Sequence, residues 1–161
     1  MPLVAVQEQH QRLPAALARR AALREDVLTG GLAVLAVYQL ALALFMVAAP
    51  HSFFANIGPF GTRNDHYIRD TATFSAAIGL GLAIAVRNRS WRVPMLAITT
   101  AQFALHSVNH LVDIEKSHPA WNGYADFFSL AGATLLLAWL LRLALAQARG
   151  GIHSTHKGVQ R

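Results

Sequence analysis

The sequence predicts an all-α integral membrane protein, a four-helix bundle with both termini in the cytoplasm. Hydrophobic residues make up 54% of the 161 residues and charged residues only 14%, against roughly 25% charged in a typical soluble domain. The apolar residues are gathered in four blocks, each near the length of about 20 residues that crosses the hydrocarbon core of a bilayer. The basic residues flank these blocks, as membrane topology requires.

The chain begins with a basic segment, residues 1–27, in which alanine, leucine and arginine favour helix. Two interpretations stay open for it: an amphipathic helix lying on the anionic cytoplasmic surface, or a mobile basic leader. The four-helix transmembrane domain is predicted over residues 28–146. Its first span runs from about Leu28 to Ala49, and because it is longer than a signal-peptide core and is followed by Pro50, we expect it to remain uncleaved.

Three further spans follow. The loop 50–63 is rich in glycine, proline and phenylalanine, so we expect it to fold back into the interface or over the helix ends. The second span runs from about His66 to Val86, where Gly79 and Gly81 allow close helix–helix approach. The third and fourth spans are expected at about 93–112 and 124–145, before a basic cytoplasmic tail, residues 147–161.

The basic residues also predict the orientation. Of the 14 lysines and arginines, all except Arg63, Arg69 and Lys116 fall on the side that holds both termini and the loop 87–92. Short basic segments stay in the cytoplasm, so we expect a multi-pass protein of the plasma membrane with both termini inside. The lipid bilayer then explains the net charge of +6, and no nucleic acid partner is predicted.

This topology gathers the polar residues at one level, near the outer membrane face. They open the second span, close the third and open the fourth: His66, Arg69, Asp70, His106, Asn109, His110, Asp113 and Asp126. Ionisable side chains at membrane depth are costly and normally face a protein interior or an aqueous cavity. Because the inner halves of the spans carry mostly Ala, Leu, Ile and Val, we expect one polar site only, on the outer side.

Two pairs of side chains within this layer have the spacing of neighbours on a helix face. His66 with Asp70, and His106 with His110, are each four residues apart. Imidazole and carboxylate ligands suit a divalent metal ion, so these four are the candidate metal ligands, whereas haem or quinone is less favoured. The other candidate ligand-binding residues are Asn64, Arg69, Asn109, Asp113 and Asp126. In the competing interpretation, the same residues form ion pairs and hydrogen bonds that only stabilise the bundle.

The predicted function is binding of a metal ion, a quinone or another small ligand at this site, with redox or proton transfer, because histidine titrates nearest to neutrality. The alternative is a non-catalytic subunit of a larger membrane complex or homo-oligomer, which the small-residue helix faces would favour. The chain has no cysteine, and it contains no phosphate-binding loop, no serine nucleophile elbow and no zinc-protease motif. The sequence therefore predicts no particular reaction.

The pattern Asn64-Asp65-His66-Tyr67-Ile68-Arg69-Asp70, a small-residue helix, and then His106-Ser107-Val108-Asn109-His110 resembles a family of small four-helix membrane proteins common in actinobacteria. That family is loosely similar in topology to the DoxX-like superfamily. The resemblance covers about residues 30–145 and implies the four-helix architecture. Members of the DoxX group are tied to thiosulfate or quinone redox chemistry, often as subunits of membrane complexes. The absence of cysteine here excludes dithiol chemistry.

Overall fold

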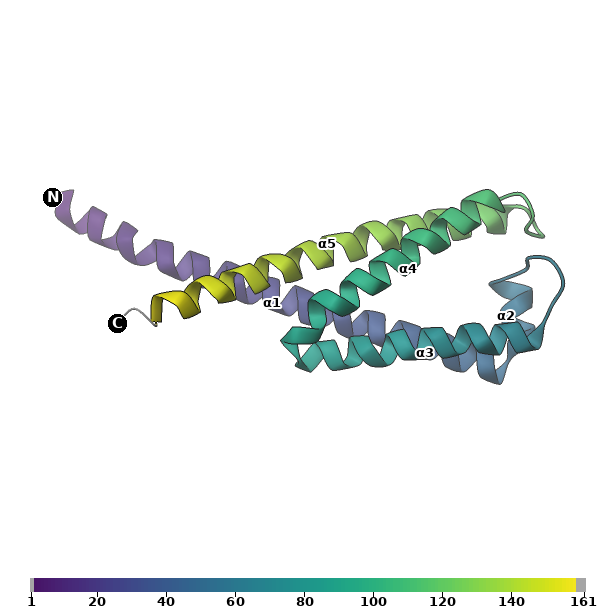
Figure 1. The fold of residues 1–161 in the computed structure, drawn as a ribbon. Helices are drawn as coiled ribbons and strands as arrows, with labels where there is room; N and C mark the ends of the chain where they lie inside the picture. Colours follow the sequence, from purple (N-terminus) through teal and green to yellow (C-terminus); the bar gives the residue numbers. More distant parts are fainter. Residues whose placement is uncertain (1, 159–161) are drawn as a thin grey trace.

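The structure, a computed structural model, describes the backbone of residues 2–158 and the side chains of residues 16–150. Four long helices form an elongated bundle (Figure 1): α1 (Pro2–Ala48), α3 (Asp65–Arg87), α4 (Arg92–Val112) and α5 (Trp121–Gly158). Two short elements lie in the connections, helix α2 (Pro50–Asn56) and the 3-10 turn η1 (Arg89–Trp91). We call the end with η1 and both chain termini the termini end, and the end with α2 and the α4–α5 loop the loop end.

Three helical segments are long and apolar enough to cross a membrane: Ala16–Ala48, Asp65–Arg87 and Trp121–Gly150. This is the pattern expected of a membrane protein. Helix α4, the expected third span, is not among them, because Gln102, His106, Asn109 and His110 lower its mean hydropathy.

The two expected terminal segments continue the outer helices without a break. Helix α1 is one helix from Pro2 to Ala48, and α5 extends to Gly158. The side chains of residues 1–15, which include Arg12, lie outside the described part, as do those of 151–161. The domain limits at residues 27 and 146 stay a prediction.

The helices associate mainly as two pairs, α1 with α3 and α4 with α5. The predicted close approach at the second span is confirmed. A Cβ atom on Gly79 would lie 2.8 Å from the Leu40 side chain of α1, and one on Gly81 would collide with Met95 of α4. At Gly79 the backbone nitrogen of Leu40 would also lie only 3.1 Å from the added atom, so glycine lets the α1 and α3 backbones come this near.

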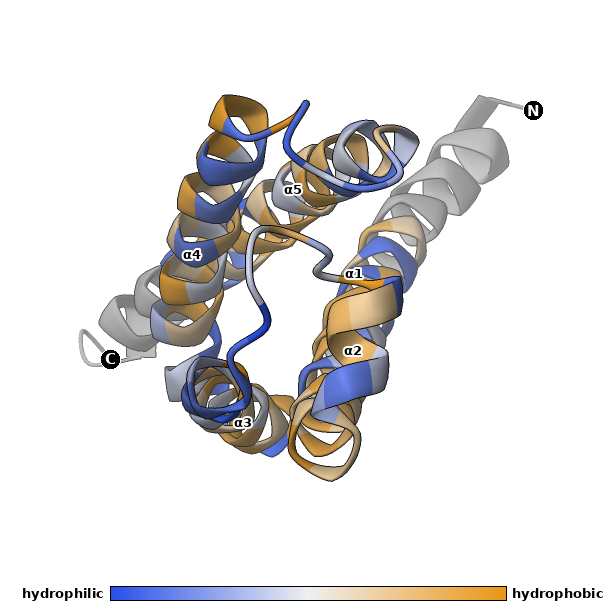
Figure 2. Ribbon diagram, turned by 90° about the vertical axis from the view of Figure 1, so that its right-hand side faces the viewer, coloured by the Kyte–Doolittle hydropathy of each residue, from blue (hydrophilic) through white to orange (hydrophobic). Residues whose placement is uncertain are grey.

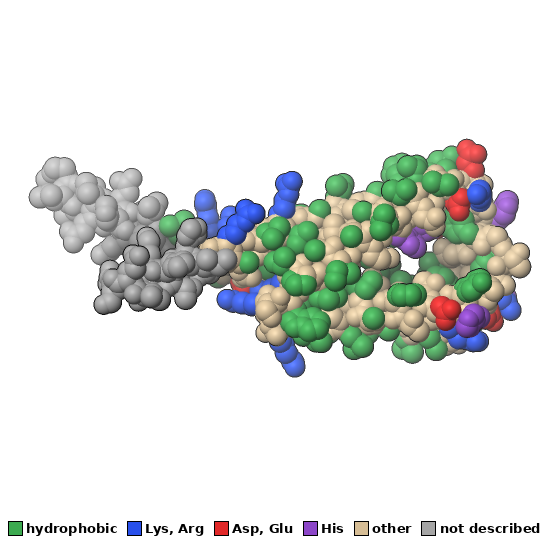
Figure 3. Space-filling view, viewed as in Figure 1, with side chains coloured by type: hydrophobic (Ala, Val, Ile, Leu, Met, Phe, Trp, Pro, Cys, Tyr) green, Lys and Arg blue, Asp and Glu red, His purple; other side chains and the backbone are tan. Residues whose placement is uncertain are grey.

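A layer of aliphatic side chains from all four long helices makes the core. Its fully buried members are Leu28, Leu32, Leu82, Leu96, Leu137 and Leu140. Large apolar side chains are also spread over the outer face of the bundle seen in Figure 3, and many in the described part are more than half exposed, including Val34, Leu44, Phe74, Leu105 and Leu135. An apolar exterior of this kind is suited to lipid rather than to water.

The two helix pairs diverge toward the loop end (Figure 1), and the space-filling view shows an opening between them there (Figure 3). The α2–α3 loop crosses this space (Figure 2), where Phe60 forms an isolated antiparallel backbone bridge with Ser117 of the α4–α5 loop. The second half of the 50–63 segment thus lies over the helix ends, one of the two arrangements expected for it, whereas its first half forms helix α2 instead of the predicted loop. This loop connects the two helix pairs at the end where the helices separate.

Candidate functional site

Two histidines of α4 form the centre of the loop-end cluster. The Nε2 atoms of His106 and His110 lie 3.0 Å apart, a hydrogen bond across one helical turn. Both side chains are partly buried. Since one neutral ring must donate and the other accept, this bond ties the tautomer of each ring to that of its neighbour.

Asp126 extends this pair to α5. Its Oδ2 atom lies 4.0 Å from Nδ1 of His110, whose side chain is only 14% exposed. That separation is longer than a hydrogen bond, so a small side-chain movement or one intervening polar atom would connect the two. The three groups lie in the order carboxylate, imidazole, imidazole.

Three polar atoms of this cluster are buried and have no hydrogen-bond partner among the described residues: Gln102 Oε1, His110 Nδ1 and Asp126 Oδ2. Gln102, His106 and His110 follow one another at intervals of four residues, so they lie along one face of α4. A buried polar atom left unpaired typically costs about 1–3 kcal/mol. Three together are unusual enough in a folded chain to need an explanation.

An aromatic residue of the α2–α3 loop borders the cluster. The Phe60 ring packs edge-on against His110, with ring centroids 5.0 Å apart. Sequence reasoning missed this residue as part of the site. The available signal was an aromatic side chain within Gly58-Pro59-Phe60-Gly61.

The predicted partner pair on α3 does not join this cluster. Nε2 of His66 lies 3.4 Å from Oδ2 of Asp70, and both side chains are more than half exposed. No interaction among the described residues connects either one to His106 or His110. The expected site of four ligands on two facing helices is therefore not formed, because the pairs that contain α3 and α4 diverge at this end.

The expected metal centre gains no support either. Within the described part of the chain, no group of three or more His, Cys, Asp or Glu side chains is arranged to hold a metal ion. In the His106–His110 pair the two Nε2 atoms face each other at hydrogen-bonding distance.

The other predicted ligand-binding residues have separate places. The Asn64 side chain caps α3 by accepting hydrogen bonds from the backbone N–H groups of His66 and Tyr67. Asp113 pairs with Lys116 at 2.7 Å, and Arg69 and Asn109 are exposed. Of that predicted set, only Asp126 lies with the histidines.

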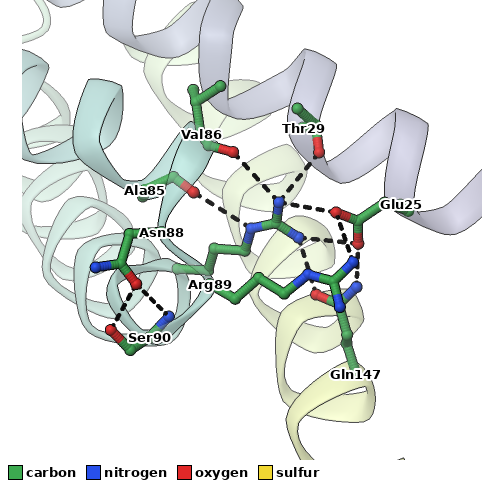
Figure 4. A network of polar contacts seen from close by, with 9 residues as sticks. Glu25, Thr29, Ala85, Val86, Asn88, Arg89, Ser90 and Gln147 are labelled. Carbon is green, nitrogen blue, oxygen red and sulfur yellow. Dashed lines mark hydrogen bonds and ion pairs between the residues drawn. The ribbon is translucent and has the colours of Figure 1, made fainter. Parts of the chain in front are cut away.

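A second polar cluster lies at the termini end, where an apolar interior was expected (Figure 4). Arg92, only 3% exposed, donates to both carboxylate oxygens of Glu25 at 2.9 and 3.0 Å and to Gln147 Oε1 at 3.0 Å. It also donates to the Thr29 hydroxyl and to the carbonyl oxygen of Ala85. The expectation of a single polar site was wrong in this respect.

This second cluster connects all four long helices. Glu25 and Thr29 belong to α1, Ala85 to α3, Arg92 to α4 and Gln147 to α5. Arg89 of η1 adds an ion pair to Glu25 at 3.2 Å. The sequence does not predict this network, because Glu25 belongs to the basic N-terminal segment and Arg92 to a basic loop. The available signal was one acidic residue, Glu25, beside an apolar span.

An apolar layer separates the two clusters. Arg92 and His106 are 14 residues apart on α4, or about 21 Å at the helical rise. Leu96 and the facing Leu137 and Leu140, all fully buried, lie in the core between them. This core layer therefore keeps the loop-end cluster apart from the Arg92 network.

Comparisons of the chain with protein-family models, with curated proteins and with solved structures give no match. The resemblance to DoxX-like four-helix proteins stays a prediction, and the function has to be argued from the geometry.

Proposed function

We propose that this chain is a four-span plasma-membrane protein with both termini in the cytoplasm, and that its loop-end cluster binds a small ligand carrying hydrogen-bond donors and exchanges a proton with it. The observation that carries the proposal is the set of three buried, unpaired polar atoms beside the His106–His110 pair. Polar groups buried in a membrane bundle are costly, so a ligand that satisfies them gains that free energy on binding.

The distribution of side chains on α4 supports a fourth span. Its apolar residues Leu105, Val108 and Val112 are each more than half exposed, whereas Ser107 is buried and His106 and His110 are partly buried. A helix with an apolar outside and a polar inside is the arrangement suited to lipid. Arg92, the charged residue at its start, is fully paired within the bundle.

The basic residues support the orientation. Arginines gather at the termini end (Figure 3), among them Arg19, Arg20, Arg24, Arg87, Arg89 and Arg149. Positively charged segments remain on the cytoplasmic side. The opening beside the histidine cluster then faces outward.

The unpaired atoms select the ligand class. When His110 donates its Nε2–H to His106, its Nδ1 is an acceptor, and Gln102 Oε1 and Asp126 Oδ2 are acceptors as well. A ligand with N–H or O–H groups, such as a protonated amine or a hydroxylated ring, would match these acceptors, and His110 Nδ1 and Asp126 Oδ2, 4.0 Å apart, are near enough to share one such group.

The other tautomer supplies the proton transfer. A proton accepted at Nδ1 of His106 displaces the Nε2 proton of that ring onto Nε2 of His110, and the Nδ1 proton of His110 moves to Oδ2 of Asp126. One proton enters and one carboxyl group forms, so the charge is balanced along three groups that lie 3.0 and 4.0 Å apart. Imidazole rings suit this role because each can accept at one nitrogen while donating at the other.

The test is nitrogen-15 NMR of histidine-labelled protein in lipid nanodiscs, titrated with methylammonium and with phenol as donor-bearing probes. We expect the ring-nitrogen signals of His106 and His110 to move in a saturable way with at least one probe, and Asp126→Asn to abolish the response. The exposed His66–Asp70 pair is the matched control, since His66→Gln should leave the response intact. Equal movement of the His66 signals, or none at all with either probe, would contradict the proposal.

Assembly into a homo-oligomer or a larger complex stays a prediction. Native mass spectrometry of the protein released from nanodiscs would test it, and a monomer alone would count against it.

A further inference from the structure

A groove on the outer surface of α3, near the termini end, is separate from the polar cluster described above. It has a volume of about 550 Å³ and is lined by Leu80, Ala83, Ile84, Arg87 and Asn88. All five residues are exposed and lie on one face of α3, so the groove is a shallow, open strip that runs lengthwise along this helix for about 10 Å. Most of it is apolar, and its polar groups are confined to one end.

The polar end carries a positive charge with no acidic partner. Among residues 16–150, no ion pair joins Arg87 to an acidic side chain. Glu25, the acid of the nearby network, is already engaged by Arg92, Arg89 and Gln147. The Arg87 guanidinium is thus able to pair with an anion from outside the chain.

Asn88 adds a neutral donor at the same end. Its side-chain oxygen accepts from the backbone N–H and the hydroxyl of Ser90, and its amide nitrogen takes no part in that network (Figure 4). A guanidinium beside an amide N–H group matches a phosphate, which offers several acceptor oxygens.

The groove also has the depth of a lipid. It belongs to the membrane-spanning candidate Asp65–Arg87, so Leu80 and Ile84 lie at the level of the acyl chains while Arg87, at the end of the span, lies at the level of the headgroups. Trp91, 41% exposed, is the kind of residue that marks this interface.

We propose that this groove binds one anionic phospholipid, with an acyl chain along Leu80, Ala83 and Ile84 and its phosphate at Arg87 and Asn88. Charge complementarity favours a headgroup with net negative charge over phosphatidylcholine, whose trimethylammonium group offsets the phosphate. Free phosphate would pair with Arg87 but, unlike a phospholipid, would have no acyl chain to contact Leu80, Ala83 and Ile84.

The test is native mass spectrometry of the full chain with phosphatidylglycerol or phosphatidylcholine of identical acyl chains. We expect phosphatidylglycerol to be retained preferentially. Arg87→Gln should weaken its binding roughly five-fold, the effect of about one interfacial arginine. Arg149→Gln is the matched control, because Arg149 is an exposed arginine of α5 that does not line the groove, and it should leave retention unchanged.

A second variant tests the apolar half of the groove. Ala83→Trp keeps the charge and fills the groove on an exposed helix face, so it should reduce retention of both lipids, with an unchanged melting temperature showing that the fold is intact. Equal retention of the two lipids, or equal effects of Arg87→Gln and Arg149→Gln, would overturn the proposal. A dimer lost specifically in Ala83→Trp would also overturn it, by assigning the groove to a second copy. None of these results depends on the histidine cluster.

Discussion

At the termini end of the bundle, Arg92 places its guanidinium among Glu25, Gln147 and Thr29, and its donors all find acceptors. At the loop end, His110 and Asp126 are partly buried, yet each keeps one buried polar atom without a partner among the described residues. The termini-end network joins four helices that pack tightly, whereas the loop-end cluster lies where the helix pairs separate (Figure 1). A polar network whose members are all paired can serve the fold by itself, while one with unpaired members loses stability that a bound partner could restore.

The largest effect should come from breaking the termini-end network. In Glu25→Ala, Arg92 keeps its buried charge and loses its carboxylate, so we expect a destabilisation of about 3–5 kcal/mol. Chemical unfolding in mixed micelles would measure it. Asp26→Ala, at an exposed neighbouring position, should have almost no effect on the free energy of unfolding. Equal stability of the two variants would show that the buried charge of Arg92 does not need the Glu25 carboxylate.

A smaller loss should follow from spreading the α1–α3 pair. In Gly79→Ala the new methyl group meets Leu40 at 2.8 Å, and overpacking of this kind costs about 1–3 kcal/mol. The same substitution at Gly132, where nothing lies within 4 Å, should be neutral or slightly stabilising. Melting temperatures of the two variants give the comparison, and a stabilised Gly79→Ala would show that the two helices are not held by this approach.

At the loop end, removing the aromatic cover should change access more than stability. Phe60→Ala loses an edge-on contact with His110 worth about 1 kcal/mol and uncovers that ring. We expect faster modification of His110 by diethylpyrocarbonate, read by peptide mass spectrometry. His66, whose side chain is 77% exposed, is the internal standard. An unchanged rate at His110 would mean that Phe60 does not limit access.

The smallest effect should have the opposite sign. Gln102→Leu replaces a buried, unpaired acceptor with an apolar side chain, so we expect the protein to become more stable by about 0.5–1 kcal/mol and its response to donor-bearing probes to weaken. Thermal unfolding with and without phenol or methylammonium would test both parts. A loss of stability comparable to that of Glu25→Ala would contradict the proposed difference between a paired cluster at the termini end and an incompletely paired cluster at the loop end.

The helices and their membrane character could be predicted from the sequence, because long apolar blocks and flanking arginines are local features. The close approach at Gly79 and Gly81 was predictable because small residues in a span are also a local feature. The His106–His110 pair was predictable because side chains four residues apart meet on one face of a helix. The placement of Asp126 near that pair followed only from assuming that both helix ends lie at one depth.

Which side chains meet across helices was decided by the tertiary structure alone. Depth suggested that His66 and Asp70 would join His106 and His110, but the diverging helix pairs leave them exposed on α3. The same packing turned Arg92, a basic loop residue by sequence, into the most connected polar side chain of the termini end. Sequence spacing shows which residues share one face of a single helix. Which faces meet depends on how whole helices rotate and diverge, and contacts between helices, such as Gly79 with Leu40, set that arrangement.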